Sequence, residues 1–252
     1  MNSCTTCKEA IEHCMSTHTF AFAHLYGDEK IMDMHIHNCC EVYYSISGGK
    51  QFLIDHCLYD IRPGDLFLIN QFESHHLTQI DQQTHERIIL SIDPEYLSKL
   101  STGATDLGHC FSFRDTRMPH QIHLSPKEQN RFMYFIHELH DDGGMGEDLL
   151  DQAIFLELMV FLNRAFAARC TDAAAPAPAP SSNYHAQVDA ILSYINSHIG
   201  EPLTLAGLSA HFFMSTSYLC RIFKEATGTT INKYITCLLY TSPSPRDVEE
   251  SR

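Results

Sequence analysis

The chain has 252 residues and a formal net charge of −14, from 17 basic and 31 acidic residues. It contains no run of 18 apolar residues and no basic segment followed by an apolar one at its start. The sequence therefore predicts neither a membrane span nor a secretory signal, and it favours a cytoplasmic protein. Ten cysteines in a chain of this size, without such a signal, do not predict a disulfide scaffold. Most of the negative charge lies in the first 170 residues, so that region is not expected to bind nucleic acid.

The first 14 residues are expected to form a flexible N-terminal extension ahead of the first domain. Cys4 and Cys7 have C-x-x-C spacing, and Cys14 and several histidines lie close by. Thiolate and imidazole groups at such spacing can bind zinc, so a metal site there stays open as an alternative. One C-x-x-C pair does not by itself specify a metal.

Short segments rich in β-branched and aromatic residues follow one another between Phe20 and Ile92, and turn signals separate them. Turns are expected at residues 47–49 (Ser-Gly-Gly) and 62–65 (Arg-Pro-Gly-Asp). The segments expected to be strands are 31–37, 41–47, 51–55, 66–70 and 87–92. Many short strands joined by tight turns predict a small antiparallel barrel.

Two histidines lie just ahead of the second of these segments. His35 and His37 would share one face of a strand, because the side chains of a strand alternate between its faces. Glu41 follows four residues after His37, and Gly48 follows seven residues after Glu41. This H-x-H-x3-E-x6-G spacing resembles the first motif of the cupin barrels.

A second run, PGDLFLINQFESH at residues 63–75, resembles the other cupin motif, although Gln71 and Phe72 stand where that motif carries Pro-Gly. The resemblance covers about residues 15–110 and is to the sensor cupins of AraC-type regulators. It implies an α+β fold with an antiparallel cupin-like β-barrel that binds a small-molecule effector. A barrel of eight strands has room for one such ligand.

Several polar side chains are expected to line this pocket. Tyr43 and Tyr44 would point to opposite faces of their strand, so only one of them can face inwards. Groups of this kind suit a sugar or another polar effector. The residues expected to bind the ligand are His35, His37, Glu41, Tyr43 and His75.

The same polar set leaves a different function open. Imidazole and carboxylate groups suit Fe, Mn, Ni or Zn, so His35, His37, Glu41 and His75 could hold a divalent metal ion. The chain would then be a metal-dependent cupin enzyme or a metal-sensing regulator. In the sensor cupins that it resembles, the pocket usually binds its ligand without a metal. The resemblance therefore implies no cofactor and no catalysis.

Two helices are expected after the barrel. Ser125, Pro126 and Glu128 form a capping-box pattern with proline at the first helical position. Residues 141–146 should end that helix, and a second is expected from about 147 to 169. It has more apolar residues than one buried stripe needs, so it should be buried on more than one side. The AraC-type resemblance implies a homodimer contact here, and packing onto its own barrel is the alternative.

Residues 171–183 (TDAAAPAPAPSSN) form a Pro/Ala segment, which favours an extended polyproline conformation of about 3.1 Å per residue. This composition predicts a linker. It would separate a cupin-like ligand-sensing and dimerisation domain over residues 15–170 from a small all-α domain over residues 184–236.

Three helices are expected after the linker. Apolar residues from Val188 to Ile199 form one stripe, and Gly200 and Pro202 should end that helix. Thr204 can cap a short second helix, and Ser215 can cap a third. A short helix, a turn and an amphipathic helix are the parts of a helix–turn–helix, whose last helix enters the major groove of DNA.

The third helix reads S-x-x-Y-L-x-R-x-F-K-x-x-x-G over residues 215–228, which resembles the first of two helix–turn–helix units of AraC-type transcription regulators. Ser209 replaces the usual alanine, and Phe213 stands near the turn where glycine is favoured for a positive φ. A three-helix bundle without a role at DNA is the alternative. Local charge does not decide between them, because residues 184–236 hold three basic and three acidic residues.

The outward face of the third helix is expected to contact double-stranded DNA. Leu219, Ile222 and Phe223 form its buried face. Arg221 is the expected base reader, because arginine can pair bidentately with guanine, and Lys224 should meet phosphate. The residues expected to contact DNA are Thr216, Ser217, Cys220, Arg221 and Lys224.

The end of the chain has a different origin in this interpretation. Residues 237–247 (CLLYTSPSPRD) match, residue for residue, the translation of a transposase adapter used in sequencing libraries, and 248–252 fit the sequence that adjoins it. Residues 237–252 are therefore expected to be an artefactual tail, and a natural Ser/Pro-rich tail is the alternative. The sequence predicts a C-terminally truncated, ligand-responsive transcription regulator that is not an enzyme.

Overall fold

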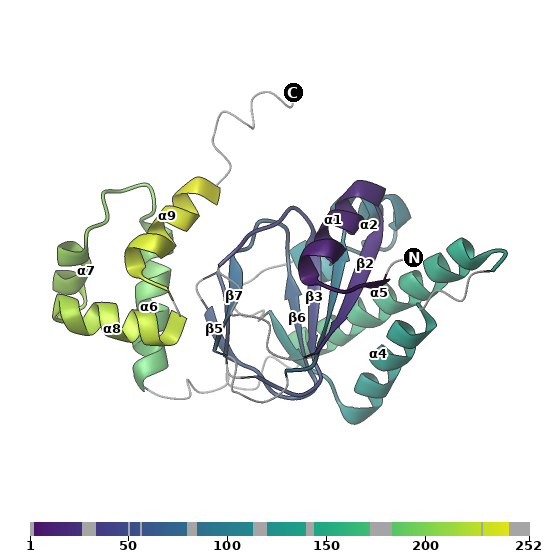
Figure 1. The fold of residues 1–252 in the computed structure, drawn as a ribbon, viewed down its shortest axis with the longest axis horizontal. Helices are drawn as coiled ribbons and strands as arrows, with labels where there is room; N and C mark the ends of the chain where they lie inside the picture. The colour runs from purple at the N-terminus through teal and green to yellow at the C-terminus, as the bar shows by residue number, and fades with distance from the viewer. Residues whose placement is uncertain are drawn as a thin grey trace, which may run out of the picture.

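The structure is a computed structural model that describes residues 3–26, 34–49, 51–55, 57–79, 85–112, 120–139, 144–171, 183–227 and 229–241. A sheet-rich N-terminal part carries helices on its flanks, and a group of helices from the C-terminal end of the chain lies beside it (Figure 1). Residues 172–182 of the predicted linker and residues 242–252 of the predicted tail lie outside the described residues.

Two sheets form the N-terminal part. The larger has the strand order β1 (Ser3–Cys4), β2 (Phe20–Leu25), β8 (Arg87–Ile92), β3 (Cys40–Ser45), β6 (Asp65–Ile69) and β9 (Gln121–His123). The smaller has the order β5 (Cys57–Asp60), β4 (Gln51–Ile54) and β7 (His75–Gln79). The pair β1–β2 is parallel and the other pairs are antiparallel. The predicted α+β fold with an antiparallel, cupin-like barrel is confirmed.

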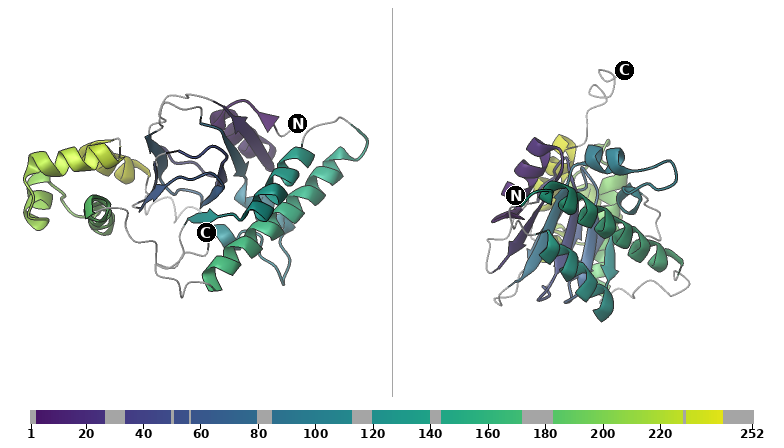
Figure 2. Two further views of the ribbon diagram at one scale, coloured as in Figure 1. Left: turned by 90° about the horizontal axis from the view of Figure 1, so that it is seen from below. Right: turned by 90° about the vertical axis from the view of Figure 1, so that its right-hand side faces the viewer.

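The helices fall into two groups. Around the barrel lie α1 (Cys7–Thr17), α2 (Pro94–Leu100), α3 (His109–Ser112), α4 (Pro126–Glu138) and α5 (Glu147–Thr171). The helix–turn–helix unit consists of α6 (Asn183–Ser197), α7 (Leu205–His211), α8 (Thr216–Thr227) and α9 (Ile231–Thr241). Helices α4 and α5 lie side by side across the larger sheet (Figure 2). None of the described helices is both long and apolar enough to cross a membrane.

The larger sheet is buried on both faces. Along β3, Val42 and Tyr44 belong to the apolar cluster that the sheet shares with α4 and α5. Tyr43, between them, belongs to the cluster inside the barrel. The two tyrosines therefore point to opposite faces, as predicted. Strands covered on both sides are expected to be almost continuously apolar, which explains the composition of β6 and β8.

The N-terminal residues differ from their prediction. The expectation of a flexible extension over residues 1–14 is wrong for the described residues 3–14, because β1 pairs with β2 and α1 begins at Cys7, where Thr6 caps it through its side-chain oxygen. Cys7 and Cys14 are buried where α1 packs on β2 and β8. Of the groups of three or more possible metal ligands among the described residues, neither includes a cysteine.

The helix–turn–helix unit follows its sequence signals closely. Thr204 Oγ1 accepts a hydrogen bond from the Gly207 N–H at 3.0 Å, and Ser215 Oγ accepts one from the Tyr218 N–H at 3.2 Å. Both predicted caps are thus formed. Helix α9 continues through Thr241, so the first residues of the segment expected to be artefactual are helical.

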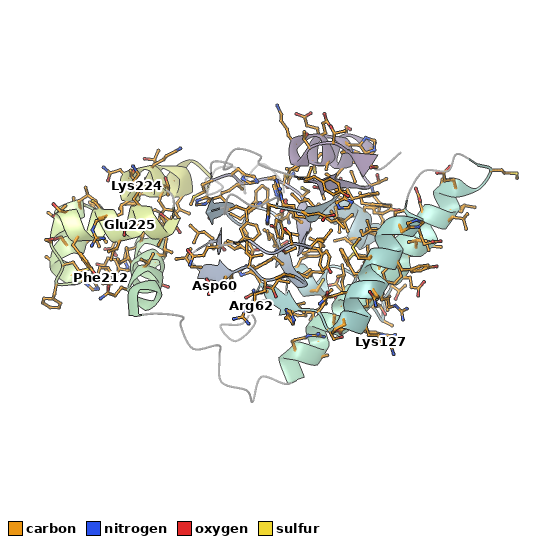
Figure 3. The ribbon with its side chains drawn as sticks, turned by 60° about the horizontal axis from the view of Figure 1, so that its bottom comes forward. Asp60, Arg62, Lys127, Phe212, Lys224 and Glu225 are labelled. Carbon is orange, nitrogen blue, oxygen red and sulfur yellow. The ribbon has the colours of Figure 1, made fainter. Side chains whose placement is uncertain are left out.

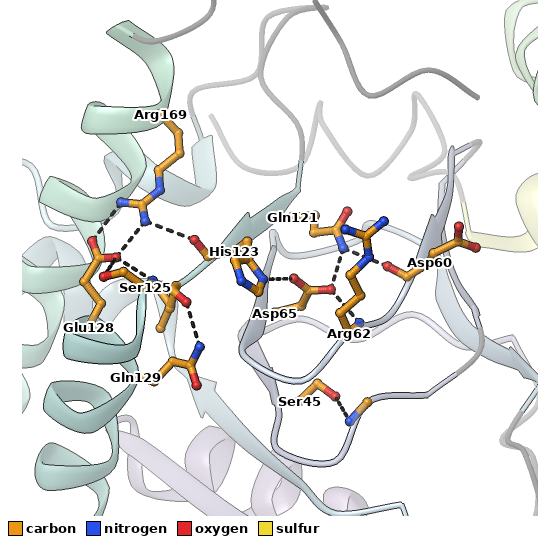
Figure 4. Close-up of polar contacts among 12 residues, drawn as sticks. Ser45, Asp60, Arg62, Asp65, Gln121, His123, Ser125, Glu128, Gln129 and Arg169 are labelled. Carbon is orange, nitrogen blue, oxygen red and sulfur yellow. Dashed lines mark hydrogen bonds and ion pairs between the residues drawn. The ribbon is translucent and has the colours of Figure 1, made fainter. Parts of the chain in front are cut away.

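Arg169, near the end of α5, joins α5 to the start of α4 (Figure 4). Its guanidinium donates to the two carboxylate oxygens of Glu128 at 2.8 Å and to the His123 carbonyl at 3.0 Å. Glu128 also accepts from the Ser125 N–H at 2.8 Å, which completes the predicted capping box. The bonds from Arg169 lower the pKa of Glu128 to about 2. One carboxylate therefore caps α4 and ties α5 to it.

Replacing Arg169 by methionine is expected to lower the free energy of unfolding by about 1.5–3 kcal/mol, because it removes hydrogen bonds to a charged partner. The control is Arg131→Met, which removes a more exposed ion pair between the same helices, Arg131 to Glu157 at 2.7 Å. That variant should cost at most about 1 kcal/mol. Urea unfolding measures both effects.

The contribution of Arg169 should also depend on pH. Because the Glu128 pKa is about 2 instead of the usual 4.5, the stabilisation is complete above about pH 4.5 and is lost as the pH falls towards 2. The stability difference between the unchanged chain and Arg169→Met should therefore shrink over that window. A difference that stayed constant down to pH 3 would contradict this account.

Candidate functional site

The polar residues of the two cupin-like motifs meet inside the barrel. His75 begins β7, and Glu41 lies in β3. His35 and His75 exchange backbone hydrogen bonds of 3.3 and 3.1 Å. This isolated bridge replaces the regular strand expected around His35 and His37. The prediction that these two histidines share a face is nevertheless correct, since both rings lie beside that of His75.

Glu41 lies within a group that we call the histidine cluster, made of His35, His37, Glu41 and His75, of which all but the partly buried His35 are buried. Its Oε2 atom lies 3.0 Å from His37 Nε2 and 3.7 Å from His75 Nε2. The rings of His35 and His37 have centroids 4.3 and 4.8 Å from that of His75. The nitrogens that the three histidines can offer to a ligand lie within 4.8 Å of one another. One small ligand or ion can therefore contact them together.

Backbone carbonyls orient two of these rings. His37 Nδ1 lies 3.0 Å from the Cys39 carbonyl, and His75 Nδ1 lies 2.9 Å from the Glu73 carbonyl. A carbonyl only accepts hydrogen bonds, so each Nδ1 carries the proton and each Nε2 faces the cluster. The ring orientation is thus set from outside the cluster.

The cluster favours the charged form of its carboxylate and of two of its imidazoles, His37 and His75. Burial alone would raise the pKa of Glu41, but His75 and His37 more than offset it, and the Glu41 pKa lies below its usual value. Burial opposes charge on His37, yet its hydrogen bonds to Cys39 and Glu41 raise its pKa to about 9. Burial also opposes charge on His75, but Glu41 raises the pKa of His75. Near neutral pH, the site therefore holds the Glu41 carboxylate beside a protonated His37.

Tyr43 faces the barrel interior, as predicted, but its hydroxyl does not join the histidine cluster. It lies 2.5 Å from His85 Nε2, and His85 Nδ1 lies 2.6 Å from the Gly48 carbonyl. The ring of Phe52 lies between the two polar groups, 4.9 Å from the ring of Tyr43 and 6.1 Å from that of His75. Burial raises the pKa of Tyr43, so its hydroxyl stays protonated.

The structure also brings together polar residues that no motif indicated. His85 is one, since only the fold brings it to Tyr43. Asp55, Glu73 and His120 form the second group of possible ligands among the described residues, with His120 Nε2 3.2 Å from Glu73 Oε2. These residues come from separate turns of the chain, and their spacing matches no local pattern.

The predicted DNA-binding face lies on α8, where Leu219, Ile222 and Phe223 are buried, as expected. Lys224 projects outwards next to Glu225 (Figure 3). Four of the five predicted contacts are exposed: Thr216, Ser217, Arg221 and Lys224. The fifth, Cys220, is half-buried against the core of the unit, so it offers less surface than the sequence suggested.

Arg221 is held at the surface by its neighbours. Its guanidinium lies 5.3 Å from the centre of the Tyr218 ring and forms an ion pair of 3.1 Å with Glu225. Tyr218 in turn donates a hydrogen bond to Gln187 on α6 at 3.4 Å. A base edge must therefore compete with the Glu225 carboxylate for Arg221.

Two phenylalanines occupy backbone conformations that favour glycine. Phe213, in the turn between α7 and α8, has φ +53°, and Phe72 has φ +63°. Both are positions where the sequence patterns suggested glycine, and each costs about 1 kcal/mol relative to it. The Phe72 N–H donates to the carbonyl of His37 at 2.9 Å, so this strained turn helps to hold the histidine cluster.

Replacing Glu41 by glutamine is expected to lower the pKa of His37 from its value of about 9, because the hydrogen bond and charge of the Glu41 carboxylate are lost while burial still opposes the charged ring. A raised histidine pKa stabilises the fold below pH 6.5, and this stabilisation is lost as the pH rises towards 9. Stability of the unchanged chain should fall over that window, and the fall should be smaller in Glu41→Gln. Imidazole NMR titration and urea unfolding measure the two effects.

The matched control is Glu86→Gln, which removes the half-exposed partner of His24 at 2.9 Å. It should leave the pH dependence of stability between 6.5 and 9 unchanged. The assignment fails if Glu41→Gln and Glu86→Gln give the same profile.

Comparison with known proteins agrees with both parts of the chain. Residues 19–159 match the family described as the AraC-like ligand binding domain. Residues 195–236 match the bacterial regulatory helix-turn-helix proteins of the AraC family. The uncharacterized HTH-type transcriptional regulator YbfI of Bacillus subtilis (strain 168) is 25% identical over 202 residues, which cover 80% of this chain and 68% of YbfI.

Two solved structures are similar to the chain at low identity. The AraC-like transcriptional activator CuxR is 15% identical, with 82% of this chain and 68% of CuxR covered and a TM-score of 0.35. ToxT from Vibrio cholerae is 10% identical, with 87% and 98% covered and a TM-score of 0.40. The ligand-binding family match alone spans more than half of the chain. The chain therefore belongs to the AraC family of transcription regulators, with the ligand-binding domain of that family ahead of its DNA-binding helix–turn–helix.

Proposed function

We propose that the histidine cluster binds a small polar effector, such as a sugar, and that its occupancy controls DNA binding. The observation that carries this proposal is His75 Nε2, which is buried and has no hydrogen-bond partner. Glu41 Oε2, at 3.7 Å, is too far away to serve as one. A buried polar atom in this state costs about 1–3 kcal/mol. A ligand hydroxyl that reached His75 would recover part of that free energy.

Occupancy would act by changing how the sensor is arranged relative to the helix–turn–helix unit or to a second subunit. A ligand can shift such an equilibrium only if it binds one arrangement more tightly than the other. The order of sensor, linker and helix–turn–helix along the chain supports this mechanism.

A divalent metal ion is the second candidate for the same site. His35, His37 and His75 offer nitrogens within 4.8 Å of one another, and Glu41 adds a buried carboxylate. These donors fit Fe, Mn, Ni or Zn, and the rings are oriented with Nε2 towards the cluster. An ion bound there would polarise a ligand oxygen as a Lewis acid. The chain would then be a metal-sensing regulator or a metal-dependent cupin enzyme.

Titration calorimetry on the whole chain tests both candidates, with a panel of sugars and sugar acids and with MnCl2, NiCl2 and ZnCl2. We expect a member of the panel to saturate one site and His75→Gln to weaken its binding at least tenfold. The control is His123→Gln, since His123 is exposed and pairs with Asp65 outside the cluster. Saturable metal binding that only His75→Gln abolishes would favour the metal candidate. No saturable heat from any sugar would contradict the effector proposal.

We propose three parts for the chain: a sensor over residues 15–170, a linker over 171–183 and a DNA-binding domain over 184–236. Helix α1 packs on β2 and β8, which supports adding residues 7–14 to the sensor. We also propose a cytoplasmic location, because the partner of the helix–turn–helix is genomic DNA.

We propose that Arg221 reads a base and that Lys224 contacts phosphate. Both are exposed on α8, and Leu219, Ile222 and Phe223 on its other face are fully buried. A unit with balanced local charge should bind random duplex DNA with a Kd of about 10⁻⁴–10⁻⁶ M. Sequence preference must then come from the few side chains that reach base edges.

Arg221→Ala is expected to relax the sequences that the chain selects from a random duplex library, because it removes about 1–3 kcal/mol of discrimination. Lys224→Ala should instead weaken binding to all sequences and reduce the salt slope by about one unit. Lys233→Ala, on α9, serves as the charge-matched control. An unchanged preference in Arg221→Ala would show that α8 does not read bases.

We propose a homodimer formed through the outward side of α5. Leu149 and Leu150 begin this helix and are 65% and 67% exposed, and Val160 and Phe161 further along are half-buried. Apolar side chains concentrated on one surface helix are typical of protein–protein contacts.

Replacing Leu149 and Leu150 together by serine is expected to shift the chain from dimer to monomer in sedimentation velocity, because the contact loses its apolar side chains. Leu239→Ser is the control, since Leu239 is similarly exposed, at 57%, but lies on α9. Equal sedimentation coefficients for the double variant and the unchanged chain would place any dimer contact elsewhere.

A further inference from the structure

The outer face of the smaller sheet lies against the helix–turn–helix unit. Side chains alternate along β4: Phe52 and Ile54 belong to the barrel core, whereas Leu53 between them points away from it. Leu53 is nevertheless fully buried, and it lies in the same apolar cluster as Ile191 and Ile222 of the unit. A barrel residue thus completes the core of the helical unit.

Neighbouring residues extend this contact. Leu58 of β5 is the direct cross-strand partner of Leu53, and it packs partly buried against the same cluster. Met34 adds a third apolar side chain. Helix α6 contacts β5 directly. Asp60, at the end of β5, lies on the side of the barrel next to the unit (Figure 3). We call Met34, Leu53 and Leu58 the docking face.

A hydrogen bond fixes the position of α9 on this face. Tyr234 of α9 is fully buried, and its hydroxyl donates to the Asp55 carbonyl at 2.8 Å. Asp55 forms the turn between β4 and β5 with φ +49°, a left-handed conformation in which its carbonyl is oriented by the turn. The apolar contact and this bond come from different helices of the unit, so together they restrict its rotation.

The docking face shares its backbone with the histidine cluster. Ile54 pairs with His75, and the Asp55 N–H donates to the Ser74 carbonyl at 2.6 Å. The Ser74 N–H donates back to Asp55 Oδ1 at 3.0 Å. On the other side, Met34 directly precedes His35 in the chain. A displacement of His35 or His75 would therefore be passed to the residues that hold the unit.

We propose that the docking face is a binding surface for the chain's own helix–turn–helix unit, and that docking fixes the orientation of α8 relative to the histidine cluster. The recognition residues Arg221 and Lys224 stay exposed when the unit is docked, so docking orients the unit without covering its DNA-binding face. The proposal deepens the proposed function and rests on it only in calling the unit DNA-binding.

A single tryptophan can report on docking, because the chain has none of its own. In a Leu58→Trp chain, docking should give a blue-shifted emission and slow quenching by acrylamide. Adding Leu53→Ser should shift the emission to longer wavelength and raise the quenching constant at least twofold. Leu53 points out of the barrel, so this change leaves Phe52 and Ile54 in place. Far-UV circular dichroism checks that the sheets persist.

A second variant changes the contact on the side of the helix–turn–helix unit. Tyr234→Phe keeps the buried ring and removes only the bond to Asp55, so it should move the emission and the quenching in the same direction by a smaller amount. Tyr134→Phe, at an exposed tyrosine of α4, should change neither. Emission and quenching that stay unchanged in both the Leu53→Ser and Tyr234→Phe chains would overturn the proposal.

Amide hydrogen exchange tests docking in a chain that carries no introduced tryptophan. In a Leu53→Ser chain, exchange should rise in both β5 and α9, and equal exchange in the two chains would count against docking. Neither measurement uses DNA or an effector. A failure to dock is therefore distinguishable from a failure to bind either one.

Discussion

Strands β2, β8, β3 and β6 carry apolar side chains on both faces, so water must be excluded from both. Helices α4 and α5 cover one face, and the smaller sheet covers the other. This double burial holds the larger sheet as a rigid middle layer, because a shift of any strand would expose apolar surface on two sides. Two groups of polar residues lie inside this apolar frame, the histidine cluster and the Tyr43–His85 pair, with Phe52 between them.

Because it is buried among apolar residues, the His37–Glu41 ion pair costs folding free energy. Removing two charges from water costs several kcal/mol per ion, and apolar residues of similar size often stabilise a fold as well or better. The barrel core does not need these charges for packing, since it is closed by aromatic and aliphatic side chains. The proposed binding role would account for these charges, because a preformed set of donors and acceptors can meet a polar ligand without first reorganising.

Local patterns predicted the local features of this chain. The caps at Thr204, Ser215 and Ser125, the two faces of β3 and the buried stripe of α8 all follow from residues a few positions apart. The histidine cluster was predicted through motif spacing, although its first two histidines lie outside a regular strand.

The missed features depend on residues far apart in the chain. Tyr43 meets His85 through the fold alone, and the segment around Leu53 has the composition of an ordinary core strand. Nothing near Leu53 in sequence indicates that helices about 140 residues later cover its outer side. Helix α1 was missed for another reason: a run rich in cysteine and charge suggested an extension, and only its contacts with β2 and β8 give it a buried face.

The outward position of Leu53 also affects how the sensor can be studied alone. A fragment that ended before α6 would keep Leu53 and Leu58 side by side on the outer sheet surface, now facing water. Apolar side chains on a sheet surface promote association between copies. Self-association of such a fragment would then arise from a surface that is covered in the whole chain. Its oligomeric state would therefore say nothing about the outward side of α5.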